Sequence, residues 1–377
     1  MKVMLGLSGG VDSAVSAYLL KQQGYDVVCC FMRNWDSMTN NDVLGNPTID
    51  DNICPQEQDY LDAKAVADKL GLPMMRIDFV KEYWDYVFTY FLDEYKKGRT
   101  PNPDIFCNKY IKFGPFLDFA KKNNCDMIAM GHYAKRVDIG DKTYLCRATD
   151  LTKDQTYFLS QISQYQLKSC LFPLGNITKK EVREIAKKLD LESVMNKKDS
   201  TGVCFIGERN FKEFLENYLP AKKGDIVDIE TGRVLGKHDG VLYYTIGQRK
   251  GLGIGGISGE VAKGWFVCKK DVDKNILYVA SGDEDEHLLG DSAVINMINL
   301  FNGPILDGTH INCKFRYRQA DQGVTLYNNN DGSVKLVFDK NYKTVTPGQG
   351  CVFYDDDVCL GGGIIDKVFY KGLVRNY

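Results

Sequence analysis

The first residues of the chain place the strongest constraint on its fold. Residues 2–7 form a short apolar run typical of a buried strand. The polar, glycine-rich stretch Ser8–Ser13 follows at once, and apolar residues then recur at helical spacing until Gly24. This order predicts a strand, a tight turn and a helix.

Further strand-like and helix-like segments alternate behind this unit. Residues 26–32, 74–78 and 126–130 have the composition of buried strands, and a helical pattern ends at Leu70 before Gly71. Such alternation predicts an α/β domain built on a parallel sheet with helices on both faces. Ligands of these sheets bind beyond the carboxyl ends of the strands, where Ser8–Ser13 falls.

The composition and the periodicity of the sequence change after about residue 210. Glycines become frequent, helical periodicity fades and short β-type runs appear. We therefore expect an α/β domain over residues 1–208, a small central α+β domain over 209–290 and a C-terminal β-barrel over 291–377. The β-type runs are residues 241–246, 265–268, 313–317, 334–338 and 351–354.

The charge balance gives no overall attraction to nucleic acid. The chain has 48 basic and 50 acidic residues and a formal net charge of −2, so any nucleic-acid binding must use local patches. One candidate is the helix predicted over 178–189, which opens with a Thr178-x-x-Glu181 capping box. Its lysine-rich face is typical of a solvated surface, and an RNA-phosphate patch is the alternative.

Other features bear on cellular context and metal content. The sequence has no apolar run of 18 or more residues and no signal peptide at its start, so we expect a cytoplasmic protein without a membrane partner. Twelve cysteines without an export signal indicate mostly reduced thiols. Because there is no C-x-x-C pair and only four histidines, we expect neither zinc nor an iron–sulfur cluster.

The stretch Ser8-Gly9-Gly10-Val11-Asp12-Ser13 carries the clearest chemistry. Its two glycines allow the backbone to approach phosphate, and the following helix N-terminus supplies amide donors. Asp12 is suited to hold Mg²⁺ on the phosphates. The stretch lacks the Walker A pattern and resembles the signature of the PP-loop ATP pyrophosphatases, which split ATP into AMP and pyrophosphate.

Two cysteines lie in polar segments. Cys107 follows Asn102-Pro103-Asp104, and Cys204 lies in Asp199-Ser200-Thr201-Gly202-Val203-Cys204. A reactive thiolate needs partial exposure and positive surroundings, which makes these two better candidates than Cys29 and Cys30 inside an apolar run. Most loop cysteines have no chemical role, so their surroundings alone leave the matter open.

Taken together, these motifs resemble the tRNA-specific 2-thiouridylase family over essentially the whole chain. The resemblance rests on ordered segments: the PP-loop, residues 31–35, 102–107, 131–134, 153–159, 199–207, 244–249 and 316–319.

The resemblance implies sulfur insertion at the 2-position of the wobble uridine of tRNA. ATP with Mg²⁺ would adenylate the carbonyl oxygen, and a sulfur nucleophile would then displace AMP. Cys204 would carry the sulfur as a persulfide, and Cys107 would attack or resolve it and leave a Cys107–Cys204 disulfide. Asp104 would act as a general acid/base; the structural alternative is that Asp104 fixes the turn after Pro103.

The resemblance also implies the binding residues and partners. We expect tRNA with a wobble uridine, a persulfide-donating sulfur-relay protein and a monomeric chain. The role of the long polar loop Ser37–Pro55 stays open between contacting tRNA, closing over ATP and lying on the surface without a function. A PP-loop enzyme acting on another acceptor, such as a small-molecule synthetase, and a non-catalytic tRNA-binding protein remain alternatives. The implied ATP site is Gly6, Leu7, Ser8, Gly9, Gly10, Val11, Asp12, Ser13, Met32 and Gly131; the target-base site is Asn102, Pro103 and Asp104; and the tRNA contacts are His132, Lys153, Asp154, Gln155, Arg316, Tyr317 and Gln349.

Overall fold

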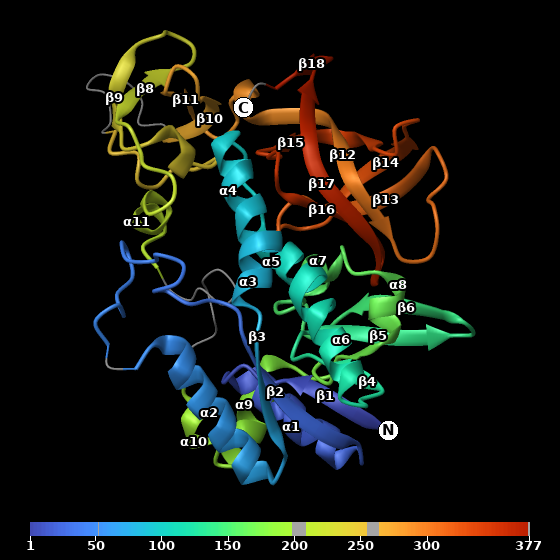
Figure 1. The fold of residues 1–377 in the computed structure, drawn as a ribbon. Coiled ribbons are helices and arrows are strands. Elements are labelled where there is room, and N and C mark those ends of the chain that lie inside the picture. The colour runs from blue at the N-terminus through green and yellow to red at the C-terminus, as the bar shows by residue number, and fades with distance from the viewer. Residues whose placement is uncertain (52, 198–208, 255–263, 376–377) are drawn as a thin grey trace.

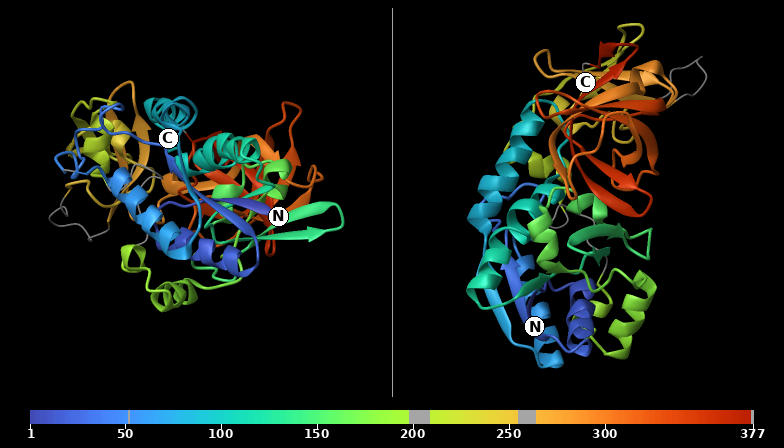
Figure 2. Two further views of the ribbon diagram at one scale, coloured as in Figure 1. Left: turned by 60° about the horizontal axis from the view of Figure 1, so that its bottom comes forward. Right: turned by 90° about the vertical axis from the view of Figure 1, so that its right-hand side faces the viewer.

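The computed structural model of the chain describes residues 1–51, 53–197, 209–254 and 264–375. Figure 1 shows an N-terminal sheet with its helices, a small central β-unit and a C-terminal barrel. In the right-hand view of Figure 2 the N-terminal sheet lies at one end of the molecule and the barrel lies toward the other. The predicted order of an α/β part, a small central part and a β-barrel is confirmed.

The N-terminal sheet is parallel and has five strands. Its order is β3 (Met74–Asp78), β2 (Asp26–Arg33), β1 (Lys2–Gly6), β4 (Met127–Ala129) and β7 (Cys170–Leu171). Strand β1 pairs with β2 on one side and with β4 on the other. The order of the strands therefore reverses at β1, and the turn that follows β1 lies at the switch point where such sheets bind ligands.

Helices cover both faces of this sheet, as predicted. Val3 and Leu5 face one apolar core with α1 (Val11–Gln22) and α2 (Pro55–Leu70), whereas Met4 faces the other core. This alternation follows from the two-residue period of a strand. The first face also carries α9 (Lys179–Lys188) and α10 (Glu192–Met195); the second is packed with α3 (Val80–Tyr83), the π-helical turn η1 (Trp84–Phe88), α4 (Thr89–Lys96), α5 (Pro103–Cys107), η2 (Asn108–Lys112) and α6 (Pro115–Lys122).

The central part is a four-stranded sheet that follows α11 (Phe211–Glu216). Its order is β10 (Trp265–Asp271), β11 (Ile276–Ser281), β8 (Gly224–Asp228) and β9 (Val234–His238). The β-run predicted at residues 241–246 is wrong, because residues 241–243 form a 3₁₀ turn, η3, after Gly240 at a φ of 150°. Its apolar side chains are buried at a turn and not in a strand.

The C-terminal part is a closed six-stranded barrel. The barrel order is β12, β15, β14, β13, β16 and β17, and the pairing of β12 with β17 closes it. The hairpin β5–β6 of the N-terminal part joins this sheet, since β6 pairs with β17 through Cys146 and Val358. The strands of the barrel are β12 (Leu289–Leu300), β13 (Thr309–Lys314), β14 (Gln322–Asn328), β15 (Val334–Lys343), β16 (Gly350–Asp355) and β17 (Val358–Tyr370), and β18 (Leu373–Val374) pairs with β17. The added hairpin is β5 (Ala134–Ile139) and β6 (Lys142–Arg147). In the chain, α7 (Thr156–Leu159) and α8 (Gln164–Lys168) follow β6, and the 3₁₀ turn η4 (Glu286–Leu288) precedes β12.

Within the described residues, the helices are all too short or too polar to cross a lipid bilayer.

Candidate functional site

The loop between β1 and α1 is held in shape by its own serines. The backbone amide of Ser8 donates to Oγ of Ser13 at 3.1 Å, and Oγ of Ser13 donates to the carbonyl of Gly10 at 3.0 Å. The two hydroxyl oxygens are also 3.1 Å apart. Ser8 is exposed, and the loop lies at the N-terminus of the 12-residue helix α1. Because such an N-terminus carries unpaired amides and the positive end of the helix dipole, this arrangement is suited to bind an anion.

Glycine is needed at two places around this loop. Gly9 has a φ of +74°, and a Cβ there would lie 2.3 Å from the backbone oxygen of Asp59. A Cβ on Gly131 would lie 3.1 Å from the amide nitrogen of Ser13, so the end of β4 packs directly against the start of α1. A side chain at either position would deform the loop. These close approaches are consistent with a phosphate cradle.

The other residues implied at the ATP site lie close to the loop. Gly6 ends β1, and a Cβ there would be 3.0 Å from Cε of Met32 near the end of β2. The amide of Leu7 donates to the carbonyl of Cys30 at 2.9 Å. The structure therefore brings Gly6–Ser13, Met32 and Gly131 together at one edge of the sheet. The donor set and the glycine cradle fit the phosphates of ATP.

Asp12 lies in a network that the sequence did not suggest. Both of its carboxylate oxygens accept hydrogen bonds of 2.8 Å from Nζ of Lys179, and Oδ1 also accepts one of 2.7 Å from the hydroxyl of Tyr133. Lys179 is the first residue of α9, and its side chain is 11% exposed. The predicted lysine-rich face of α9 therefore does not include Lys179, which points to α1. The capping box of Thr178 and Glu181 is present as predicted.

A second lysine, Lys197, holds the opposite side of the loop. Its Nζ donates to the carbonyl of Gly9 at 3.0 Å and to Asp59 at 2.8 Å, and it pairs with Asp62 at 2.5 Å. Burial raises the pKa of Asp59, against the opposing effect of Lys197. Sequence reasoning missed this residue, because it follows α10 without any recognisable motif. It fixes the loop backbone to α2.

The segment implied at the target base forms a capped helix. Asn102 is the N-cap of α5, and its side-chain oxygen accepts from the amide of Asp104 at 3.1 Å. Pro103 occupies the first turn, where it costs no hydrogen bond. Asp104 is half-buried. Cys107 ends the helix and is 0% exposed, so the expected partial exposure of this thiol is wrong for the structure described here.

The C-terminal barrel contacts this segment directly. The amide of Thr100 donates to the carbonyl of Pro347 at 3.1 Å, and Nε2 of Gln349 donates to the carbonyl of Thr100 at 2.6 Å. A Cβ on Gly350 would lie 2.5 Å from Cδ1 of Ile105 inside α5. Gln349, implied as a tRNA contact, therefore also joins the barrel to the segment that carries Asp104.

His132 lies inside the protein. Its ring is between Phe113 and Phe172, with centroid separations of 6.1 and 6.3 Å. Burial lowers its pKa well below 6.5, and the charge of Lys112 lowers it further. Nδ1 is buried without a hydrogen-bond partner among the described residues. A neutral ring in an aromatic pocket is poorly placed for a direct phosphate contact.

The residues Lys153, Asp154 and Gln155 differ in their placement. Asp154 is buried and accepts from the amide of Ala148 at 3.0 Å and the hydroxyl of Thr156 at 2.7 Å. The side-chain oxygen of Gln155 accepts from the amide of Tyr133 at 3.0 Å. Lys153 is half-buried. Asp154 and Gln155 therefore shape the turn before α7, and Gln155 also holds the residue that contacts Asp12.

Arg316 and Tyr317 lie where the central part meets the barrel. Nη2 of Arg316 donates to the carbonyl of Ile246 at 2.9 Å and to the carbonyl of Thr344 at 3.0 Å. The ring of Tyr317 packs on Phe158 with centroids 4.3 Å apart. Burial raises the pKa of Tyr317, and the charge of Asp154 adds to the effect. Arg316 joins two parts of the chain.

Cys204 falls outside the described residues, so the structure does not place it. The chain resumes at Arg209, whose Nη2 lies 2.9 Å from Oδ2 of Asp42. Asp42 is fully buried and also accepts from Nε1 of Trp35 at 3.0 Å. The polar loop over residues 37–55, whose role the sequence left open, is thus fastened to the start of the central part.

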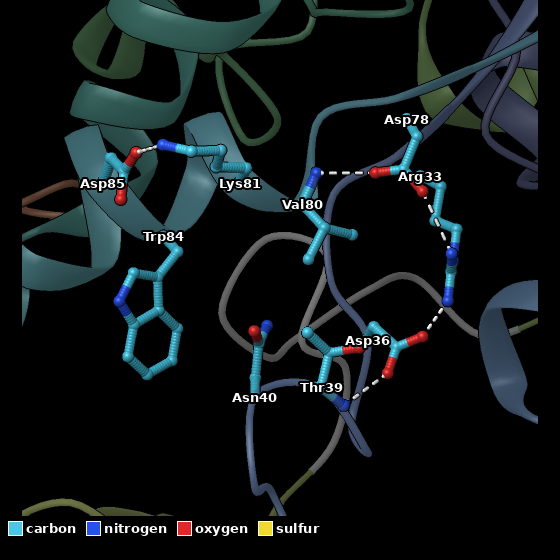
Figure 3. A pocket seen from close by; sticks show the side chains of 9 residues that line it. All are labelled: Arg33, Asp36, Thr39, Asn40, Asp78, Val80, Lys81, Trp84 and Asp85. Atoms are coloured by element: carbon cyan, nitrogen blue, oxygen red, sulfur yellow. Dashed lines mark hydrogen bonds and ion pairs between the residues drawn. The ribbon is translucent and has the colours of Figure 1, made fainter.

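A cavity of about 470 Å³ lies beside this loop at the ends of β2 and β3. Figure 3 shows Arg33 between Asp36 and Asp78 on one wall, with Trp84 on the other. Both acidic groups pair with Arg33, so this wall of the cavity carries positive and negative charges side by side. None of the residues implied for ATP or the target base lines this cavity; its lining is Arg33, Asp36, Thr39, Asn40, Asp78, Val80, Lys81, Trp84 and Asp85.

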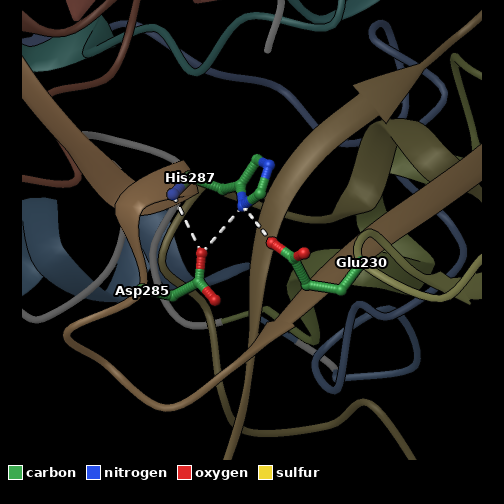
Figure 4. A group of neighbouring side chains, drawn as sticks. All are labelled: Glu230, Asp285 and His287. Carbon is green, nitrogen blue, oxygen red and sulfur yellow. Dashed lines mark hydrogen bonds and ion pairs between the residues drawn. The ribbon is translucent and has the colours of Figure 1, made fainter.

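Three metal-ligating side chains meet in the part of the chain around η4. Nδ1 of His287 lies 2.8 Å from Asp285 and 3.3 Å from Glu230 (Figure 4). The backbone amide of His287 also donates to Asp285 at 2.9 Å, as in an ordinary N-cap. These contacts are explained by hydrogen bonding within the group.

Comparison with known families covers all three parts of the chain. The tRNA methyl transferase HUP domain matches residues 1–208, the tRNA methyl transferase PRC-barrel domain matches 212–281, and the aminomethyltransferase beta-barrel domain matches 293–365. The first of these models covers the PP-loop, α5 and Lys179.

Similar curated proteins match the chain almost from end to end. A protein of Mycoplasma capricolum named tRNA-specific 2-thiouridylase MnmA is 58% identical over 97% of this chain and 99% of its own. Proteins of the same name from Mycoplasma mycoides and Mesoplasma florum are 57% and 56% identical over the same shares. With such identity along nearly its whole length, this chain belongs to the tRNA-specific 2-thiouridylase family.

Proposed function

We propose that the protein catalyses the ATP-dependent 2-thiolation of the wobble uridine of tRNA. The single observation that carries this function is the identity of more than half of its residues with proteins of that name over nearly the full length. The glycine cradle around Ser8–Ser13 and the capped segment Asn102–Cys107 supply the two groups of residues that the reaction needs.

The first step is activation of the carbonyl. ATP supplies a leaving group: O2 of uridine attacks the α-phosphorus, pyrophosphate departs and an adenylated uridine forms. The amides at the start of α1 and the hydroxyls of Ser8 and Ser13 bind the phosphates. Asp12 would hold Mg²⁺, which would supply positive charge to neutralise the phosphates. Asp104 lies on the capped segment and moves the proton at the base.

The second step is sulfur transfer. The terminal sulfur of a persulfide on Cys204 attacks C2 and AMP leaves. The thiolate of Cys107 then attacks the sulfur of Cys204, so that the persulfide bond breaks, 2-thiouridine is released and a Cys107–Cys204 disulfide forms. A thiol reductant restores both cysteines. The disulfide requires Cα atoms within roughly 7 Å of each other. Because Cys107 is buried, its thiol must become accessible to the sulfur of Cys204 before this step.

The remaining assignments follow the same scheme. The units are residues 1–208 for ATP and catalysis, 209–290 as a small central domain, and 291–377 as the tRNA-contacting barrel. Lys153, Arg316 and Tyr317 lie on the tRNA side, Gln349 holds the segment that carries Asp104, and the partners are tRNA and a persulfide-donating protein. The target base leaves the anticodon stack, as base-modifying enzymes require. The protein acts as a monomer in the cytoplasm.

The test uses the purified chain with Mg²⁺-ATP, a persulfide as the sulfur donor, a thiol reductant and unmodified tRNA. Digested tRNA is analysed for 2-thiouridine by mass spectrometry, and nucleotides are analysed for AMP. We expect both products from the wild type and from Cys54→Ser, a control at an exposed cysteine. Cys204→Ser and Cys107→Ser should lose thiouridine and retain ATP binding.

The alternatives give other results. Full activity of both cysteine variants would exclude the persulfide route. AMP without thiouridine would favour a synthetase with another acceptor, and tRNA binding with neither product would favour a non-catalytic protein. A methylated nucleoside would exclude thiolation in favour of the activity named in the family descriptions.

A further inference from the structure

The ion pair between Asp12 and Lys179 lies at the loop to which we assign the phosphates of ATP. Nζ of Lys179 is 2.8 Å from each carboxylate oxygen of Asp12, and Tyr133 donates to one of the same oxygens. Lys179 is 9% exposed, whereas the next residue, Lys180, is exposed to solvent. The two neighbouring lysines on α9 therefore have different surroundings, and only the first reaches the loop.

The charges around the loop explain why a lysine is useful there. An unneutralised carboxylate at position 12 would repel phosphates bound at this loop, because like charges interact more strongly in a partly buried setting than in water. Lys179 removes that repulsion by pairing with Asp12. If Asp12 binds a metal ion with the nucleotide, its hold on Lys179 weakens, and the ammonium group is already beside the phosphates.

Lys197 shows the contrasting arrangement. Its Nζ has three oxygen acceptors, the carbonyl of Gly9 and the carboxylates of Asp59 and Asp62. Three acceptors match the three donors of an ammonium group, and two of them are negative. Lys197 is thus suited to fix the backbone of the loop, whereas Lys179 pairs with Asp12 inside the loop itself.

We propose that Lys179 is a phosphate-binding residue, which Asp12 holds in place until the nucleotide arrives and which then contacts the phosphates. The proposal rests on the function proposed above and adds a binding residue to its first step. It replaces the expectation that Lys179 belongs to the solvated, lysine-rich face of α9, for which an RNA-phosphate patch was the alternative.

The test measures pyrophosphate binding by titration calorimetry in a buffer free of divalent metal. Without metal, Asp12→Asn should bind pyrophosphate roughly 10-fold more tightly than the wild type, because Lys179 is released from its carboxylate partner and can donate a charge-assisted hydrogen bond to the phosphate. The double variant Asp12→Asn/Lys179→Met should lose that gain and bind roughly 10-fold more weakly than Asp12→Asn. Lys180→Met in the Asp12→Asn background is the matched control and should bind within about twofold of Asp12→Asn, because exposed charges act weakly.

The outcomes separate the two proposals. The double variant removes both charges, so no lone buried charge threatens folding, and circular dichroism checks this. Equal pyrophosphate affinity of Asp12→Asn and the double variant would overturn the role of Lys179. An equal loss from Lys180→Met would also overturn it, because any nearby charge would then suffice. A wild-type protein that binds neither pyrophosphate nor Mg²⁺-ATP would contradict the proposed function itself.

Discussion

Gln349 in the barrel donates a hydrogen bond of 2.6 Å to the backbone carbonyl of Thr100, two residues before the N-cap of α5. The barrel therefore helps to fix the segment that carries Asp104 and Cys107. We expect Gln349→Ala to lower the rate of thiolation by roughly fivefold, the effect of one lost hydrogen bond. Single-turnover kinetics and tRNA affinity should be measured together, and the affinity should stay within about twofold.

Gln322→Ala is the matched control, because its side-chain amide donates to the carbonyl of Ala320, two residues away in the chain. A Gln349→Ala variant with unchanged single-turnover rate and weakened tRNA binding would instead identify Gln349 as a direct tRNA contact.

The buried pair of Asp42 and Arg209 fastens the loop after β2 to the central part. The side chains are 0% and 7% exposed. Asp42→Ala leaves the guanidinium of Arg209 buried without its carboxylate, which costs about 3–5 kcal/mol of unfolding free energy. Urea titrations followed by tryptophan fluorescence measure this loss directly, since Trp35 donates to Asp42.

Asp68→Ala removes the acid of the exposed i,i+4 pair with Lys64 and should leave the urea midpoint unchanged. If the two variants unfold at the same urea concentration, the Asp42–Arg209 pair does not stabilise the folded protein.

Cys107 should react slowly with alkylating reagents in the free protein. It is fully buried at the end of α5, whereas Cys54 is exposed. A thiol must be ionised and accessible to react, and burial removes the access. We expect iodoacetamide to modify Cys54 at least roughly 100-fold faster than Cys107, measured by peptide mass spectrometry over time. Comparable rates at the two cysteines would mean that α5 opens readily without tRNA.

Local patterns predicted the N-terminal sheet and its loop well. Strand β1, the Ser8–Ser13 turn and α1 are adjacent in sequence, so apolar period and glycine placement determine them. The capping box likewise located the start of α9. The contacts that the sequence did not predict are those between segments far apart in the chain. The pairing of β6 with β17 joins Cys146 to Val358, and no local signal records a contact across more than 200 residues.

The sequence also did not indicate which individual polar residues are buried. Lys179 and Lys180 are neighbours with the same composition around them, yet one is bound to Asp12 and the other is exposed. Asp154 has the polar neighbours of a surface residue, and two donors, from Ala148 and Thr156, hold it inside. Such roles depend on which distant groups the fold brings near, so a motif identified the site without assigning every side chain.

Lys270 should make the stability of the protein depend on pH above neutrality. Its ammonium group is buried, donates to the carbonyl of Tyr244, and burial lowers its pKa from 10.5 to about 7. Between these values the unfolded chain binds a proton that the folded protein does not, so stability rises as pH rises from about 7 toward 10.5. The slope is about 1 kcal/mol per pH unit.

Lys270→Met should remove this component, which urea unfolding at several pH values measures as a difference from the wild type. Lys269→Met, at the half-buried neighbouring position, should keep the wild-type slope. Parallel pH profiles for the wild type and Lys270→Met would mean that Lys270 stays charged in the folded protein.

The exposed lysines of α9 test whether this helix contacts RNA phosphates. Lys180, Lys187 and Lys188 are exposed, unlike Lys179. Each phosphate contact releases counterions and steepens the dependence of log affinity on log salt by roughly 0.7–0.9. If the exposed face binds tRNA, changing the three lysines to Gln should flatten the slope by roughly 2. Fluorescence anisotropy with labelled tRNA between low and moderate salt gives both slopes.

The control replaces three exposed lysines of the central part, Lys222, Lys223 and Lys237, with Gln. It removes the same net charge elsewhere, so a general electrostatic effect would flatten both slopes alike. A slope that changes only for the α9 variant places this helix at the tRNA. An unchanged slope for that variant identifies the face as solvated, and the basic side chains that bind phosphate then lie on other elements.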